Sequence, residues 1–276
     1  MIRDILVSLT QGTDADAAAA YAVSLAAAHS AHITGLSVTY EIDVPPFYMG
    51  AVPTDFIDIQ MRENEASATK ASELFQGLAR EAGVAHEVRT ISASLGAAAN
   101  AFAEMSRLFD LTVVAQPNPD RPGPEEVIAE TTLLESGRAV LLVPYVQKAS
   151  YGSGRAVVAW DGSRAAVRAL NEALPLLHRA NMVEVFCAFR AHGKAPESGA
   201  EVVRHLARHG LTAKLHTLPL GSGTNVAEAI LNEVADQGAE LVVMGGYGHS
   251  PLRELVLGGV TREILASMTV PVLMAH

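Results

Sequence analysis

The chain has 276 residues, of which 49% are hydrophobic and 18% charged, a composition that can fill a globular core and excludes a disordered chain. Its formal net charge of −10 argues against a nucleic-acid-binding protein, in which a basic stripe is expected. Residues 1–150 hold 9 Lys/Arg against 19 Asp/Glu, whereas residues 151–276 hold 11 of each. We therefore expect an anionic ligand to prefer the second half.

Neither an export signal nor a membrane segment is predicted. The N-terminal residues reach acidic and polar side chains before any long apolar run, unlike a secretory signal. The alanine-rich run 17–28 is too short and too weakly apolar to span a bilayer. Cys187 is the only cysteine, so an intramolecular disulfide is excluded, and its apolar strand favours a core position. We expect a cytoplasmic protein without a membrane partner.

Short apolar runs alternate with stretches of helical period, and the series occurs twice. In the first half, the predicted strands are 2–10, 32–40, 86–92, 109–116 and 139–144, and the predicted helices are 15–29, 66–82 and 96–109. In the second half, the predicted strands are 154–162, 182–189, 213–219, 239–246 and 271–276, and the predicted helices are 164–179, 200–209, 226–237 and 260–268. This alternation predicts βαβ units around a mostly parallel sheet that is covered on both faces.

The repeated series predicts two tandem, doubly wound, five-stranded α/β domains of Rossmann-like type, residues 1–148 and 152–276. Residues 147–155 contain the small and flexible residues expected of a linker. Residues 41–64 have no counterpart of similar length in the second half. Their prolines and aromatic residues predict a structured loop, either a lid or a surface excursion that packs on its own domain.

Five glycines fall within fifteen residues after the predicted strand 239–246: Gly245, Gly246, Gly248, Gly258 and Gly259. Ligands bind at the carboxyl ends of strands in open parallel sheets, and glycine allows positive φ and a close approach of backbone to ligand. Ser250 and Pro251 are expected to begin one helix, and Val260 a second helix whose free N–H groups would face the loop. The stretch therefore predicts an anion site, because tight turns alone would need fewer glycines.

Other phosphate motifs do not fit. The chain has no Gly-Lys-Ser/Thr of a P-loop. The sequence GSGTNVAEA, which begins at Gly221, lacks the third glycine of the dinucleotide motif, and we expect a turn there with at most a secondary phosphate contact.

The spacing Gly245-x-x-Gly248-x9-Gly258 resembles the nucleotide-binding motif of the universal stress protein family, and the likeness extends over nearly the whole chain as two tandem domains. The resemblance implies the adenine nucleotide alpha hydrolase-like fold and a bound adenine nucleotide, ATP with or without Mg²⁺. Family members usually carry Ser or Thr after the third glycine, where this chain has Gly259. A hydroxyl contact to phosphate is therefore lost or passes to Thr261.

The resemblance also assigns the residues of the site. Ala159, Trp160 and Asp161 would line the adenosine side, with Asp161 as a ribose acceptor, a helix cap or both. Ala188 matches a position whose backbone contacts adenine, Met244 would flank the ring, and His249 faces either phosphate or solvent. The predicted binding residues are Ala159, Trp160, Asp161, Ala188, Met244, Gly245, Gly246, Gly248, His249, Gly258, Gly259, Val260 and Thr261.

No metal site and no catalytic residue are predicted. His205 and His209 lie four residues apart on a predicted helix, but no acidic third ligand is nearby in sequence, so a solvated helix face competes with a metal pair. No Gly-x-Ser-x-Gly elbow accompanies a Ser-His-Asp set. Phosphoryl transfer needs cations and a positioned base or water, and the glycine stretch offers only Arg253 and Arg262.

The leading interpretation is a nucleotide-binding regulatory protein of the stress-response type, with protein partners that the sequence does not identify. The alternatives are a slow ATPase or phosphotransferase and a protein-interaction scaffold with a vestigial site. The resemblance implies that the two domains pair through their last strands, and it leaves a homodimer of tandem chains open. One nucleotide per chain is expected, because Gln116, Pro117, Asn118 and Pro119 replace the glycines in the first half.

Overall fold

A computed structural model of the protein describes residues 1–41, 54–190, 198–221, 223–247 and 259–276. The first half contains β1 (Asp4–Ser8), α1 (Ala17–His29), β2 (His32–Tyr40), α2 (Thr54–Glu81), β3 (His86–Ala93), α3 (Leu95–Ser106), β4 (Leu111–Ala115), α4 (Glu125–Glu135) and β5 (Val140–Val143). The second half contains β6 (Arg155–Ala159), α5 (Arg164–Leu177), β7 (Met182–Arg190), α6 (Ser198–Arg208), β8 (Ala213–Leu220), α7 (Val226–Gln237), β9 (Ala239–Gly245), α9 (Val260–Ser267) and β10 (Val272–Ala275).

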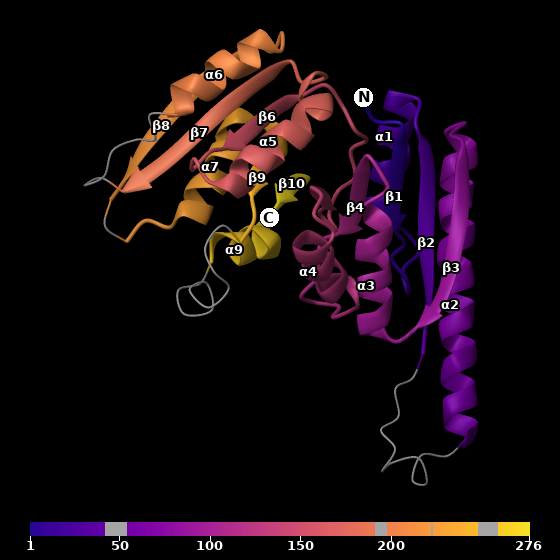
Figure 1. The fold of residues 1–276 in the computed structure, drawn as a ribbon. Helices are drawn as coiled ribbons and strands as arrows, with labels where there is room; N and C mark the ends of the chain where they lie inside the picture. The colour runs from indigo at the N-terminus through magenta and orange to yellow at the C-terminus, as the bar shows by residue number, and fades with distance from the viewer. Residues whose placement is uncertain (42–53, 191–197, 222, 248–258) are drawn as a thin grey trace.

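The ten strands form one continuous sheet in the order β3-β2-β1-β4-β5-β10-β9-β6-β7-β8. Within each half all pairings are parallel, and the halves meet through an antiparallel pair of last strands, in which Leu141 lies opposite Leu273. The predicted tandem, doubly wound α/β fold is therefore confirmed, as is the pairing through the last strands. Figure 1 shows the two halves on either side of this junction.

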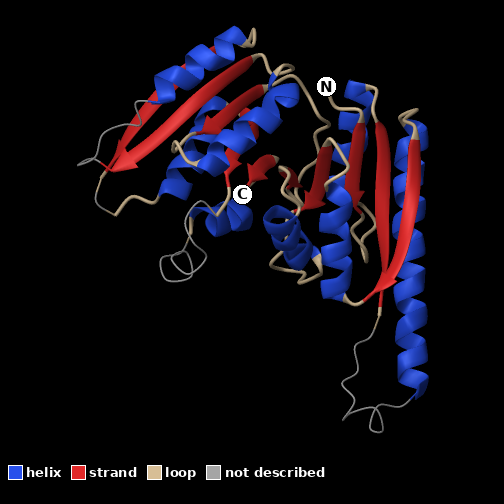
Figure 2. Cartoon of the chain, viewed as in Figure 1, coloured by secondary structure: helices blue, strands red, loops and turns tan. Residues whose placement is uncertain are grey.

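Helices cover both faces of the sheet (Figure 2), and the strand period sorts the core into two clusters. Along β6, Ala156 and Val158 belong to one cluster, whereas Val157 and Ala159 belong to the other. Successive side chains of a strand point to opposite faces, so a strand buried on both sides needs apolar residues at nearly every position. This accounts for the nearly continuous Val, Ile and Leu runs from which the strands were predicted.

Side-chain caps fix where several helices begin. Asp16 is 5% exposed and accepts from the N–H groups of Thr10 (2.7 Å) and Ala19 (3.0 Å) at the start of α1. Ser163 caps α5, and Asn225 caps α7 through its bond from the N–H of Ala227 (2.9 Å). These bonds satisfy N–H groups that have no partner within the helix.

The prediction of a loop over residues 41–64 is wrong for its second part, because α2 begins at Thr54 and runs for 28 residues. The segment is rich in charged and straight-chain residues that favour a helix, and the amide of Asn64 donates to the carbonyl of Tyr40 (2.7 Å). Residues 42–53 lie outside the described part, so a lid is neither supported nor opposed. In Figure 1, α2 extends well past the end of the sheet.

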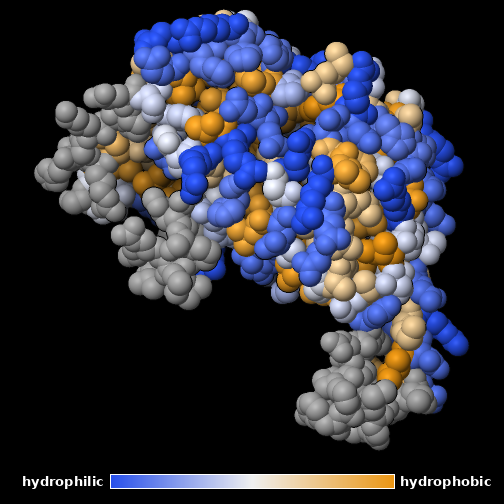
Figure 3. Space-filling model, viewed as in Figure 1, coloured by the Kyte–Doolittle hydropathy of each residue, from blue (hydrophilic) through white to orange (hydrophobic). Residues whose placement is uncertain are grey.

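The described helices include none that is long and apolar enough to cross a bilayer. In the view of Figure 3, hydrophilic residues cover the outer side of α6 at the top of the molecule. The helix α6 therefore packs through one face, which holds the buried Val202 and Leu206, and exposes the other to solvent.

Candidate functional site

A pocket of about 230 Å³ lies at the carboxyl ends of β6, β7 and β9. The strand order of the second half reverses here, because β7 lies on one side of β6 and β9 on the other. Such a switch point is where open α/β sheets bind ligands. The described lining residues are Ala159, Trp160, Asp161, Phe186, Ala188, Val226, Ile230, Met244, Gly245, Val260 and Thr261. Eight of them are predicted binding residues.

Ala159 and Trp160 contribute differently to the pocket, although they are neighbours. Ala159 packs with the cluster on the pocket face, together with Phe186 and Met244. The Trp160 side chain belongs to the cluster on the other face, and its indole N–H donates to the hydroxyl of Ser198 (2.9 Å). The Trp160 backbone N–H donates to the carbonyl of Phe186 (2.8 Å), which extends the β6–β7 pairing to the pocket.

Asp161 is exposed at the edge of the pocket, and Oδ1 accepts from the N–H of Ser163 (2.8 Å). The helix cap itself is Ser163, whose hydroxyl accepts from the N–H of Ala166 (3.1 Å). Asp161 therefore shapes the turn that leads into α5 and does not cap the helix. A carboxylate has several acceptor positions, so a ribose role is compatible with this bond.

Gly245 and Gly246 do not have the positive φ expected of them, whereas Tyr247, directly after them, has φ of 51°. A Cβ on Gly245 would lie 2.7 Å from the backbone N of Ala166, so this glycine lets α5 approach β9. A Cβ on Gly246 would lie 3.0 Å from Leu133 of the first half. Both glycines therefore permit close packing, a role that the sequence reading had not assigned to them.

The start of α9 forms the opposite wall. Gly259 stands at the N-cap position with no side-chain cap, and Val260 is the first helical residue, as predicted. Thr261 is 2% exposed, and its hydroxyl accepts from the N–H of Tyr247 (3.0 Å), which fastens the turn after β9 to α9. The predicted residues Gly248, His249 and Gly258, together with Ser250 and Pro251, lie outside the described part of the chain.

Sequence reasoning missed Phe186, Val226 and Ile230, which supply much of the apolar wall. Phe186 lies opposite Ala159 in the β6–β7 register, so correct strand alignment would have found it. Ile230 follows Val226 by one helical turn on α7, and both face the sheet at this point. Periodicity alone predicts that these residues are buried. The order of the strands is needed to tell which buried residues line a pocket at the switch point.

The corresponding positions in the first half are arranged differently. Val38 stands two residues beyond Leu36 on β2, as Ala188 stands two beyond Phe186 on β7. Val38 is 3% exposed, and its carbonyl accepts a bond from the amide of Gln11. The helix α4 begins at Glu125 and has two glutamates in its first turn.

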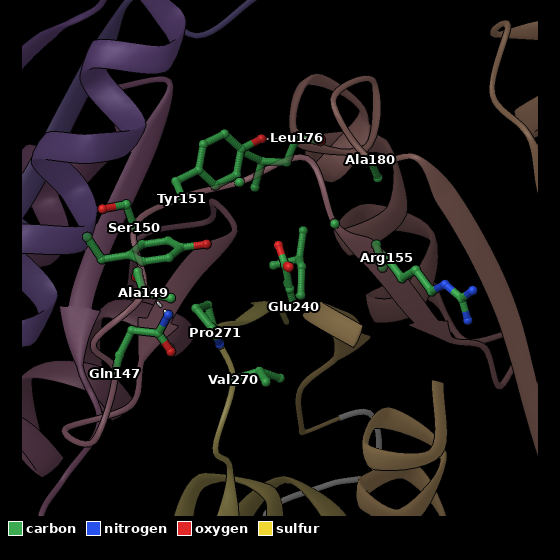
Figure 4. Close-up of a pocket in the computed structure, with 15 residues that line it drawn as sticks. Gln147, Ala149, Ser150, Tyr151, Arg155, Leu176, Ala180, Glu240, Val270 and Pro271 are labelled. Carbon is green, nitrogen blue, oxygen red and sulfur yellow. Dashed lines mark hydrogen bonds between the residues drawn. The ribbon is translucent and has the colours of Figure 1, made fainter. Parts of the chain in front are cut away.

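A second pocket, of about 190 Å³, lies at the amino ends of β6, β9 and β10, next to the linker (Figure 4). Two of its polar side chains are already engaged with backbone carbonyls, and the carboxylate of Glu240 points into the pocket. The Tyr151 hydroxyl donates to the carbonyl of Leu176 (3.3 Å), and the Arg155 guanidinium, directed away from Tyr151 in Figure 4, donates to the carbonyl of Gln237 (3.2 Å). Its position at the amino ends of the strands makes it the weaker ligand site.

Comparison with known proteins identifies the segment that holds the glycine stretch. Residues 220–276 match the family model described as "Universal stress protein family". A universal stress protein of Synechocystis sp. is 41% identical to the chain over 46 residues. That match covers 17% of this chain and 16% of the relative, so it spans a small part of both proteins.

Solved structures of other proteins resemble the whole chain. A universal stress protein from Archaeoglobus fulgidus gives a TM-score of 0.70 at 17% identity, covering 99% of this chain and 97% of its own. A functionally unknown protein from Pseudomonas aeruginosa gives a TM-score of 0.60, also at 17% identity, covering 99% and 92%. At this identity the likeness concerns the fold, and it extends over both halves.

Proposed function

We propose that this chain is a member of the universal stress protein family that binds one adenine nucleotide, ATP or a close relative, in a second domain formed by residues 152–276. The main support is the convergence of eight predicted residues on one pocket at the switch point of the second half.

The chemistry of the pocket suits the parts of a nucleotide. Ala188, Met244 and Phe186 give apolar walls against which a base can lie. The exposed carboxylate of Asp161 can accept from ribose hydroxyls. The N-terminus of α9, which lacks a side-chain cap at Gly259, has N–H groups available for phosphate oxygens. Any Mg²⁺ would be held mainly by the phosphates themselves.

We assign the protein a regulatory role in a stress response, in which nucleotide binding changes its interactions with protein partners. The described lining residues include one ionisable side chain, Asp161, and no lysine, arginine or histidine. Phosphoryl transfer depends on such cations and on a positioned base or water. The composition of the pocket therefore favours binding over turnover.

The test is an ATP titration by calorimetry of the wild type and of Gly248→Val and Gly258→Asp. A Cβ in the loop or a carboxylate at the helix start would occupy the space proposed for phosphate, so affinity should fall at least about tenfold, or 1.4 kcal/mol. Asn118→Val, at the position in the first half that corresponds to Gly248, is the matched control and should bind ATP like the wild type. Unchanged affinity in both glycine variants would reject the site.

A further inference from the structure

Three potential metal ligands from three separate elements meet on the pocket face of the second half. They are Glu184 on β7, His216 on β8 and Glu233 on α7, and their ligand atoms all lie within 4.8 Å of one another. Imidazole Nδ1 of His216 is 3.0 Å from Oε2 of Glu233 and 3.9 Å from Oε1 of Glu184. We propose that these side chains form a binding site for a divalent transition-metal ion, with zinc as the best-matched probe.

The spacing of the three ligand atoms suits a four-coordinate ion. Zinc binds histidine nitrogen and carboxylate oxygen at about 2.0–2.2 Å, so ligand atoms at the corners of a tetrahedron are about 3.4 Å apart. The two separations from His216 lie on either side of this value. Small rotations of the glutamate side chains would complete three corners and leave the fourth for water.

Burial gives an independent reason to expect a cation. The Glu233 side chain is 7% exposed and the Glu184 side chain 14% exposed, so two carboxylates share a largely dry site. Oε1 of Glu184 is buried and has no hydrogen-bond partner in the described part of the chain. Burying carboxylates side by side is costly unless a proton or a cation compensates their charge.

Groups around the three ligands hold them in position. The amide of Gln237 donates to Oε1 of Glu233 (2.9 Å), which leaves Oε2 directed at His216. The His216 ring packs against Phe186 with ring centres 5.4 Å apart, and its side chain is 42% exposed, which gives an ion a route from solvent. Such supporting contacts orient ligands in metal sites and tune their affinity.

A bound ion would join α7 to β7 and β8. Ile230, one turn before Glu233 on α7, and Phe186, two residues after Glu184 on β7, both line the pocket described above. Metal binding would therefore hold α7 and β7, which form two walls of that pocket, in a fixed position relative to each other. This inference does not depend on the identity of the ligand in the pocket, and its test uses no nucleotide.

The experiment titrates Zn²⁺ by calorimetry into the full, tag-free chain after chelator treatment. We expect one zinc per chain with a dissociation constant below about 10 µM, and a loss of affinity of at least about tenfold in each of Glu233→Gln, Glu184→Gln and His216→Asn. The double variant His205→Gln/His209→Gln is the matched control, because those two histidines lie on α6 with ring centres 4.6 Å apart. It should keep the wild-type affinity.

Circular dichroism of each variant identifies any variant that fails to fold. If His216→Asn does not fold, the two isosteric variants Glu233→Gln and Glu184→Gln still test the site. The proposal is overturned if the wild type binds zinc with a dissociation constant above about 10 µM, a result that would leave a shared proton as the compensating charge. It is equally overturned if only the His205/His209 variant loses zinc. Mg²⁺ bound as tightly as Zn²⁺ would also contradict it, because Mg²⁺ prefers an octahedron of oxygen ligands.

Discussion

Gly245 lies where β9 and α5 pack without room for a side chain. A Cβ there would lie 2.7 Å from the N of Ala166 and 2.9 Å from the Cβ of Ala165, both part of α5. We therefore predict that Gly245→Ala lowers the free energy of unfolding by about 1–3 kcal/mol, because the helix must move away from the sheet. Gly96→Ala in α3, where a Cβ would meet nothing within 4 Å, is the control and should be neutral or stabilising. Urea unfolding that gives both variants the wild-type midpoint would contradict this account.

Cys187 is fully buried, and burial, with a smaller contribution from Asp161, raises the pKa of its thiol to about 11. At pH 8 only about one thiol in a thousand would be ionised in the folded protein, and the thiolate is the reactive form. We predict that native protein reacts with a thiol reagent at least about a hundredfold more slowly than protein unfolded in urea. Because the folded pKa is the higher one, this thiol's contribution to stability is retained below pH 9 and lost between pH 9 and 11. Equal reaction rates for the native and unfolded protein would show that the thiol is accessible.

At the scale of elements, period and turn chemistry predicted the strands well, since strands buried on both faces have few polar interruptions. The start of α2 was missed because three prolines and several aromatic residues dominated the reading of residues 41–64, although the residues from Thr54 onward favour a helix. The pocket walls were missed at Val226 and Ile230 because an apolar helix face reads as core wherever it packs. Glu184, His216 and Glu233 come from three elements, so no local spacing could have brought them together.

The elements around the pocket also bear on turnover. Strands β6, β7 and β9 and helices α7 and α9 contribute Asp161 as the one ionisable group among the described lining residues. Glu263, in the first turn of α9, accepts a hydrogen bond from the amide of Asn225 and is not among those lining residues. We predict ATP turnover slower than about 1 per second, the low end of typical enzymes. Steady-state phosphate release faster than this, and abolished by Gly248→Val, would establish a catalytic role.

For the whole molecule, the junction between the halves reaches the candidate nucleotide site. The Tyr247 hydroxyl donates to Oε1 of Glu130 on α4 (3.0 Å), and the Gln116 amide donates to the carbonyl of Leu265 on α9 (2.7 Å). The first contact joins the turn after β9 to the first half of the chain, and the second joins the turn after β4 to the second half. A ligand that shifts the turn after β9 would therefore also shift the contact of Tyr247 with Glu130, and ligand binding could in this way alter the first half of the chain.

Although the two halves share one topology, their residues differ where a phosphate would bind. Pro117 and Pro119 flank Asn118, the counterpart of Gly248, and these prolines remove two N–H donors and fix φ in the turn after β4. The first turn of α4 carries Glu125 and Glu126, which place negative charge where the helix would attract an anion. The Gln11 amide donates to the carbonyl of Val38, the backbone position that corresponds to Ala188.

These differences all lead to a stoichiometry of one nucleotide per chain, held by the second half. The pocket of about 180 Å³ at the ends of β1 and β4 adds the carboxylate of Asp16, and its Arg121 is already engaged with the carbonyl of Gly12 (2.9 Å). An ATP titration of the intact chain should therefore reach saturation at one equivalent. Gly248→Val should lower the affinity at least about tenfold, whereas Asn118→Val should keep the full equivalent at the wild-type affinity. Salt would screen the long-range repulsion from the acidic first half. It would not restore the N–H donors that the prolines lack or free the carbonyl of Val38 from its bond with Gln11. The stoichiometry should therefore be the same at about 0.05 M and about 0.5 M salt. Two equivalent sites per chain, or one equivalent that Gly248→Val keeps at wild-type affinity and Asn118→Val loses, would place a competent site in the first half.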